Sequence, residues 1–413
     1  MRHSTRGLAA AVVVMTALSC KVYDESMLLP DAASSACPAP QGLSQTLGVG
    51  WWSGCDVSGA CFSARAPSAA DRPAKSDPGA DLPFMFFGFR SMRLGSRNAA
   101  GELDKNAWQE IGFDLDGVCT SSPTCPTQGE PAVSCKVVGN QIPIDGNACR
   151  DNTFGRLEYM VETTPEFGQR FKLGEPDFNC SICQGAYNFV FRVAGYNGQA
   201  NDSSVRVDIY PSPGLTALKP AVDCSSGTWD PASCWTSDDV WTVQQAYVPS
   251  GQAGPDIGDS TLYDPAAFVR DYVLVVQLRE NTVFWFPSTK ASASAYPMVL
   301  QEGIVTGRMV ATGTGWTITD GMVSGRMIWT DALDGFRRLG LCEGDPLFEG
   351  ARLFAKTSPD LLSTGAVLPD TDCDSISVGI SFVADQAQVG PLQDVPELVP
   401  CADAGSAEAG DGG

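Results

Sequence analysis

Residues 187–194 read Tyr-Asn-Phe-Val-Phe-Arg-Val-Ala, so large apolar side chains alternate with smaller or polar ones. A period of two residues is typical of a β-strand with one buried face. The alternation returns in residues 205–210, Val-Arg-Val-Asp-Ile-Tyr, and the loop between the two contains Asn197-Gly198, a strong turn signal. The sequence therefore predicts a β-hairpin here and a mainly β chain around it.

Other strands are predicted on both sides of this hairpin. Residues 84–94 favour a strand, and residues 272–278 and 282–286 predict a second, fully buried hairpin. Residues 303–310 recur as residues 321–328 with every position identical or similar, which predicts two neighbouring strands. We expect Arg308 and Arg326, at equivalent places in this repeat, to pair with carboxylates.

Helical signals are concentrated near the C-terminus. Asp345 as N-cap and Pro346 at the first helical position predict a short amphipathic helix, and residues 331–339 predict another. The expected fold is therefore mainly β, with β-sandwich-like domains stapled by disulfides and a short helical segment near the C-terminus. The expected parts are a first β domain (48–215), a Cys/Trp-rich connector (216–240), a second β domain with the helical segment (241–391) and an acidic low-complexity tail (392–413).

The N-terminus carries a secretion signal. Arg2 and Arg6 precede an apolar stretch, Leu8–Met15, which is too short to span a bilayer, and small residues precede Cys20. This arrangement resembles a bacterial lipoprotein signal. The resemblance implies a signal peptide over residues 1–19, lipidation of Cys20 and a tether over residues 20–47. Lys21 after the acylated cysteine implies anchoring to the outer membrane or cell surface, with the membrane contacted through the lipid only.

Cysteine number and spacing predict disulfides. The chain has 15 cysteines, so a lipid on Cys20 leaves an even number in an oxidising compartment. Spacing alone does not determine connectivity. Short loops favour local pairs, and one longer bridge would tie the helical segment to the strand that follows it: Cys55–Cys61, Cys135–Cys149, Cys224–Cys234 and Cys342–Cys373.

Cys180 and Cys183 have the Cys-x-x-Cys spacing of redox proteins. A predicted strand follows them, however, whereas a redox motif needs the N-terminus of a helix to lower the thiol pKa. We therefore expect both to form structural bridges.

Composition excludes several function classes. The net charge of −21 repels nucleic acid, so nucleic-acid binding is excluded. His3 is the only histidine and lies in the signal segment, which excludes Ser-His-Asp and Cys-His catalysis and zinc sites with imidazole ligands.

Acidic residues form the strongest candidate site. Asp114 and Asp116 would share one face of a strand, and Asp145, Asp151 and Asn152 add oxygen donors around a cysteine. Two ionised carboxylates repel unless a cation lies between them. Carboxylate and amide oxygens are ligands for Ca²⁺, so the sequence predicts a calcium site. The alternative is that these are ordinary turn residues of an acidic surface.

Two function hypotheses follow. The first is a surface lipoprotein with a structural or ligand-binding role, stabilised by calcium, whose protein or glycan partner stays open. The alternative is a carboxylate-dependent glycan hydrolase, which needs no histidine; no motif identifies its catalytic pair, and the sequence favours a non-enzyme. Residues 113–117, followed by residues 145–152, also resemble secreted lipoproteins of myxobacteria, which implies a surface location and no particular activity.

Overall fold

The computed structural model describes residues 53–55, 62–122, 132–138, 144–164, 174–219, 222–223, 229–287, 295–313, 315–395 and 401. The expected signal peptide and tether, Cys20, Cys61, Cys224 and most of the expected tail lie outside these ranges, as does the side chain of Cys55. Within them, no helix is long and apolar enough to span a membrane.

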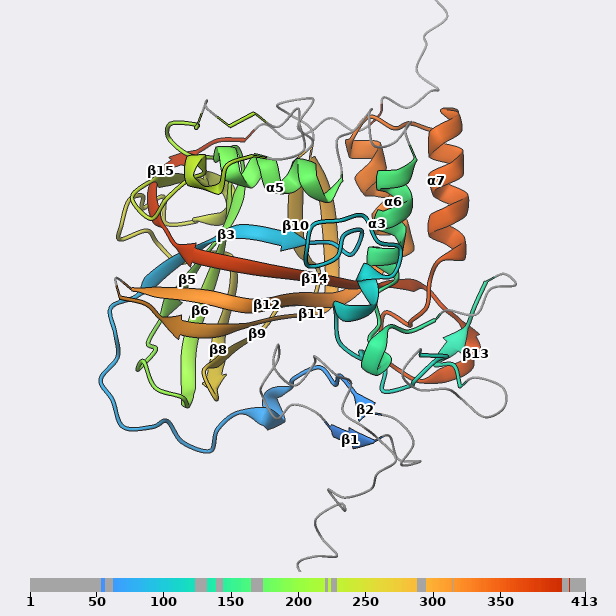
Figure 1. The fold of residues 1–413 in the computed structure, drawn as a ribbon, viewed down its shortest axis with the longest axis horizontal. Coiled ribbons are helices and arrows are strands. Elements are labelled where there is room, and N and C mark those ends of the chain that lie inside the picture. The colour runs from blue at the N-terminus through green and yellow to red at the C-terminus, as the bar shows by residue number, and fades with distance from the viewer. Residues whose placement is uncertain are drawn as a thin grey trace, which may run out of the picture.

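The centre of the molecule is a closed barrel (Figure 1). In the described part of the chain, eight antiparallel strands follow one another in the order β11-β12-β14-β3-β5-β6-β8-β9, and β9 pairs with β11 to close the ring. The strands are β3 (Met85–Arg93), β5 (Asn188–Ala194), β6 (Asp202–Ser212), β8 (Leu262–Arg270), β9 (Val273–Gln277), β11 (Ala295–Ala311), β12 (Trp316–Ile328) and β14 (Ser375–Gln386).

The mainly β class is confirmed, but the expected β-sandwich arrangement is wrong. Strands β3, β5 and β6 come from residues 48–215 and the other five from residues 241–391, yet all eight hydrogen-bond in one sheet. The cause is β11, which is 17 residues long. It pairs with β10 (Thr282–Pro287) over residues 295–300 and with both β9 and β12 farther along, so the sheet closes on itself.

The predicted hairpin of residues 272–278 with 282–286 is wrong for the same reason, because β9 and β10 pair with β11 and not with each other. The hairpin around Asn197-Gly198 is confirmed as β5 and β6. The repeated segments lie in the antiparallel neighbours β11 and β12. Both arginines of the repeat pair with carboxylates, as expected. Nε of Arg308 lies 3.9 Å from Oδ2 of Asp320, and Arg326 forms an ion pair with Glu302.

The inside of the barrel is filled by aromatic rings. Gly88 and Arg90 of β3 face Trp235, so the alternate residue Phe89 points the other way, into the barrel. Its ring lies 4.5–6.0 Å from three others, and all four are almost fully buried: Phe89, Phe189, Phe191 and Phe382. These side chains make the barrel a packed core.

Helices and short strand pairs surround the barrel (Figure 1). The helices are α3 (Thr153–Thr163), α5 (Glu175–Gln184), α6 (Trp329–Arg338) and α7 (Pro346–Thr357), with 3₁₀ turns at Ala69–Asp71, Ala107–Glu110, Asn147–Cys149, Pro231–Ser233 and Gln245–Tyr247. The strand pairs are β1 (Ser53–Cys55) with β2 (Phe62–Ser63), β4 (Cys135–Lys136) with β13 (Leu368–Asp372), and β7 (Val240–Gln244) with β15 (Gln388–Gln393).

Helices α6 and α7 confirm the predicted C-terminal helical segment, and Asp345 accepts a hydrogen bond from the backbone N–H of Leu347 at 2.9 Å, as an N-cap should. Helices α3 and α5 were not predicted. Their signals were present, since Asn152 caps α3, Pro176 lies in the first turn of α5, and Gly185 ends α5 with a φ of +77°.

The disulfides among the described residues lie outside the barrel strands, and their pairing corrects the prediction. The bonds are Cys119–Cys149, Cys135–Cys373, Cys183–Cys234 and Cys342–Cys401, and Cys180 is disulfide-bonded as well. The predicted pairs Cys135–Cys149, Cys224–Cys234 and Cys342–Cys373 are therefore wrong. Short loops were favoured, but pairing of β4 with β13 brings Cys135 within 5.2 Å of Cys373, Cα to Cα, across 238 residues.

Candidate metal centre

The loop that carries Asp114 and Asp116 is held on both sides. The backbone N–H of Asp114 donates to the carbonyl of Ala64 at 2.8 Å, and the N–H of Asp151 donates to the carbonyl of Phe113 at 2.9 Å. After these two isolated bridges the chain bends, so Asp116 does not lie on the regular strand that the sequence predicted. The bend still brings the two carboxyl groups together.

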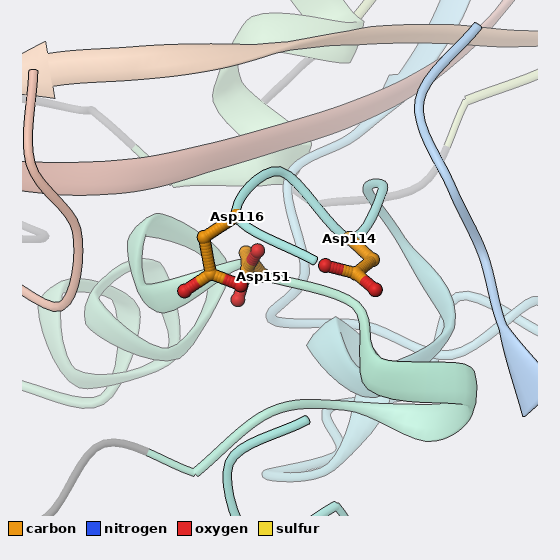
Figure 2. A group of neighbouring side chains, drawn as sticks. All are labelled: Asp114, Asp116 and Asp151. Carbon is orange, nitrogen blue, oxygen red and sulfur yellow. The ribbon is translucent and has the colours of Figure 1, made fainter. Parts of the chain in front are cut away.

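Three carboxyl groups meet at this loop. One oxygen of each of Asp114, Asp116 and Asp151 lies within 4.8 Å of the others. Figure 2 shows that Asp114 and Asp116 come from one loop and Asp151 from the neighbouring segment, with their carboxyl groups around a common space. Asp114 and Asp151 are buried and Asp116 is half-buried. We call these three residues the carboxylate cluster.

Backbone N–H groups orient each carboxyl. Gly117 donates to Oδ1 of Asp114 at 2.7 Å, Val118 donates to Oδ1 of Asp116 at 2.7 Å, and Leu115 donates to Oδ2 of Asp151 at 2.6 Å. The first two are short side-chain-to-backbone turns of the kind that aspartate favours, and the third joins the two segments that carry the cluster. The hydroxyl of Ser63 also donates to Oδ2 of Asp114. The loop therefore fixes the positions of the cluster oxygens.

The cluster holds more negative charge than its surroundings compensate. Burial raises the pKa of Asp114 to about 7, and the Asp116 carboxyl adds to this increase. Burial also raises the pKa of Asp116, and it raises that of Asp151 well above its usual range, with neighbouring carboxylates contributing. Without a cation, these groups keep protons that exposed aspartates lose near pH 4.

Arg326 of β12 acts on the cluster as a cation and lowers the pKa of Asp116. Its guanidinium is already engaged, because it forms an ion pair with Glu302 and donates to the carbonyl of Leu115 at 2.5 Å. Among the described residues, none of the three cluster carboxylates forms an ion pair with a lysine or arginine.

The other two predicted ligands lie elsewhere. Asp145 is buried, accepts a hydrogen bond from the N–H of Thr120, and acts on the cluster through its charge, but it is not among the three converging groups. Asn152 is the N-cap of α3. Its amide oxygen accepts from the N–H groups of Gly155 and Gly379, each at 2.9 Å, so it has a structural role.

Residues remote in sequence complete the surroundings. Ser63 and Arg326 contact the cluster loop, and half-buried Asp360 adds negative charge to Asp151. Burial raises the pKa of Asp360 to about 6, although Ser377 and Thr153 donate hydrogen bonds to its carboxyl. No local sequence signal links these residues to Asp114, because the fold alone brings them near it.

The disulfide Cys119–Cys149 joins the two segments that carry the cluster. Ala148 and Cys149 have φ values of 54° and 58°, a left-handed conformation that costs non-glycine residues free energy. The surrounding structure holds this segment in place, and Asp151 follows it by two residues. The bond therefore supports the position of Asp151 opposite Asp114 and Asp116.

The geometry fits a hard divalent cation. Calcium binds oxygen at about 2.3–2.6 Å, so ligands on opposite sides of the ion lie up to about 4.6–5.2 Å apart, whereas the bonds to magnesium are about 2.0–2.1 Å. The cluster oxygens all lie within 4.8 Å of one another, a spacing at which three of them can bind one calcium ion. The nearby thiols of Cys119 and Cys149 are in a disulfide and offer no thiolate ligand for zinc.

The geometry does not favour glycoside hydrolysis. Retaining and inverting glycosidases place their two carboxyl groups about 5–5.5 Å or about 6.5–9.5 Å apart, on either side of a substrate. Here three carboxyl groups crowd within 4.8 Å, and two of them are buried. Acids that converge on one point leave no room for a sugar between them.

Comparisons with known proteins return nothing: no family model, curated protein or solved structure matches the chain.

Proposed function

We propose that Asp114, Asp116 and Asp151 bind a calcium ion, and that this ion holds together the loops of a lipid-anchored surface protein with a structural or ligand-binding role. The observation that carries the proposal is the convergence of three carboxylates within 4.8 Å without an ion-pair partner among the described residues. Calcium takes six to eight oxygen ligands, and water would complete the set around the three carboxylates.

The cellular location in this proposal rests on the sequence together with the disulfides. Disulfides persist in oxidising compartments, which supports an extracytoplasmic location. Lipidation of Cys20 and display at the outer membrane or cell surface rest on residues 1–21 alone. In such a setting calcium would act as a further cross-link between loops that the barrel does not hold.

The test is thermal unfolding with calcium and with a chelator. An ion bound only by the folded protein raises the free energy of unfolding by about 2.7 kcal/mol at a hundredfold excess over Kd. Asp116→Asn keeps the acceptor for the Val118 N–H but removes one charge. We expect this variant to melt at or above the wild-type temperature in chelator, since repulsion is relieved, and to gain nothing from calcium.

The matched control is Asp370→Asn, which removes the same charge from an exposed position on β13 and should keep the full calcium response. A wild-type protein whose melting temperature ignores calcium would contradict the proposal, as would an Asp116→Asn variant with an undiminished response.

A further inference from the structure

A cavity of about 280 Å³ lies between helix α3 and the helix pair α6–α7. Helices α6 and α7 pack against each other, while α3 packs on strand β14 of the barrel. Figure 1 shows the three helices standing together on one side of the molecule. None of the cavity-lining residues belongs to the carboxylate cluster, so the inference below does not depend on the calcium proposal.

The walls of the cavity are almost entirely apolar. They include Phe154 and Leu157 of α3, Met298 and Met327 of the barrel, and Phe354 of α7. Met160, which also lines the cavity, is 45% exposed, so the cavity reaches solvent beside it. Apolar lining with access from solvent is typical of sites for small molecules.

One carboxyl group, that of Glu158, faces this apolar space. Glu158 lies on α3, is 5% exposed, and lines the cavity. Its carboxyl accepts a hydrogen bond from the backbone N–H of Glu175, the first residue of α5, which explains a glutamate at a buried position. Its other oxygen, Oε1, has no hydrogen-bond partner among the described residues.

The charges around Glu158 favour a cation. Burial raises the pKa of Glu158 well above its usual range, and the neighbouring acids Glu162, Glu175 and Asp177 add to this increase. The described residues give Glu158 no ion pair. A buried acceptor without a partner is costly, and a ligand that donates a hydrogen bond and brings positive charge would remove that cost.

We propose that this cavity binds a small apolar amine, with its hydrocarbon part between α3 and α7 and its ammonium group on Oε1 of Glu158. An apolar cavity of about 150 Å³ holds benzene, so about 280 Å³ accommodates a chain of roughly eight carbons. A fatty acid of the same length would bring its negative charge close to the acids Glu162, Glu175 and Asp177, which already raise the pKa of Glu158. An alcohol would supply a hydrogen bond without the charge.

The experiment compares three probes of equal length with the full chain, by calorimetric titration at neutral pH: octylamine, 1-octanol and octanoate. It is run once with calcium and once with chelator, so that failure here is separate from failure of the calcium proposal. We expect octylamine to bind at least about tenfold more tightly than octanol, the difference that a hydrogen bond to a charged group provides. Octanoate should bind most weakly.

Two variants test the role of Glu158. Glu158→Gln keeps an acceptor for the Glu175 N–H and should reduce octylamine affinity at least about tenfold while leaving octanol binding unchanged. The control, Glu349→Gln, removes one charge from α7 outside the cavity lining and should leave both unchanged. Equal affinities for amine and alcohol, tighter binding of octanoate, no binding of any probe, or unaltered amine binding by Glu158→Gln would each overturn the proposal.

Discussion

The barrel and the loops around the carboxylate cluster are stabilised in different ways. The barrel is a closed ladder of antiparallel strands around packed aromatic rings, and no disulfide among the described residues joins its strands. The cluster loops have few regular hydrogen bonds, a left-handed backbone at Ala148 and Cys149, and a disulfide at Cys149. The covalent cross-links therefore lie outside the region that the apolar core stabilises, and the calcium ion that we propose would add an ionic cross-link there.

A substitution inside the barrel should have the largest effect. Phe89 is 2% exposed and contacts three other aromatic rings. Phe89→Ala removes these contacts and leaves a cavity, so we expect a loss of about 3–5 kcal/mol in the free energy of unfolding, measured by denaturant titration. The increase in the free energy of unfolding on adding calcium, which we call the calcium gain, should equal that of the wild type. A reduced calcium gain in this variant would show that the two regions are not independent.

Removing the loop disulfide should cost somewhat less and act on the other region. The double variant Cys119→Ser, Cys149→Ser opens a loop of sequence separation 30, which the chain-entropy picture values at about 3–4 kcal/mol. Because the bond supports Asp151, we also expect the calcium gain to fall.

The control for this double variant is Cys183→Ser with Cys234→Ser, which removes a bond away from the cluster. It should lower stability and keep the calcium gain. If both double variants keep the full gain, the Cys119–Cys149 bond does not position the cluster.

The same two regions differ in how far the sequence predicts them. Alternation in residues 187–194 indicates a strand, because one buried face requires an apolar residue at every second position of the segment. Closure of the barrel depends on which strands pair with β11. The residue pattern of a single segment does not indicate which other strands it pairs with. For this reason the sandwich and the hairpin of residues 272–286 were wrong although the strands were right.

The cluster shows a similar division. Asp114 and Asp116 are two residues apart, and Asp151 follows the cysteine that pairs with Cys119. The acidic residues of these two short segments were therefore enough to choose all three as candidate ligands. Asn152 also offers a side-chain oxygen, that of a neutral amide, and only its place before α3 distinguishes a helix cap from a ligand. Arg326 contacts the loop from β12, and the sequence around the cluster does not predict this contact.

The pH dependence of the calcium gain is the smallest expected effect and the most specific to the cluster. Burial raises the pKa of Asp114 from its ordinary value of 3.8 to about 7 in the folded protein. A group of this kind contributes stability that is complete below pH 4 and lost as the pH rises through about 7. Without calcium, the cluster therefore favours folding at pH 5 over pH 8. Calcium binds the ionised carboxylates and competes with these protons.

The gain in melting temperature on adding calcium should accordingly be larger at pH 8 than at pH 5. Other buried acids, such as Glu158, also make the calcium-free protein less stable at high pH, but they do not alter the difference made by calcium. Asp116→Asn should abolish the gain at both pH values, whereas Asp370→Asn should keep its pH dependence. A wild-type gain that is equal at pH 5 and pH 8 would mean that calcium binds carboxylates which titrate in the ordinary range, at the exposed surface and not at the buried cluster.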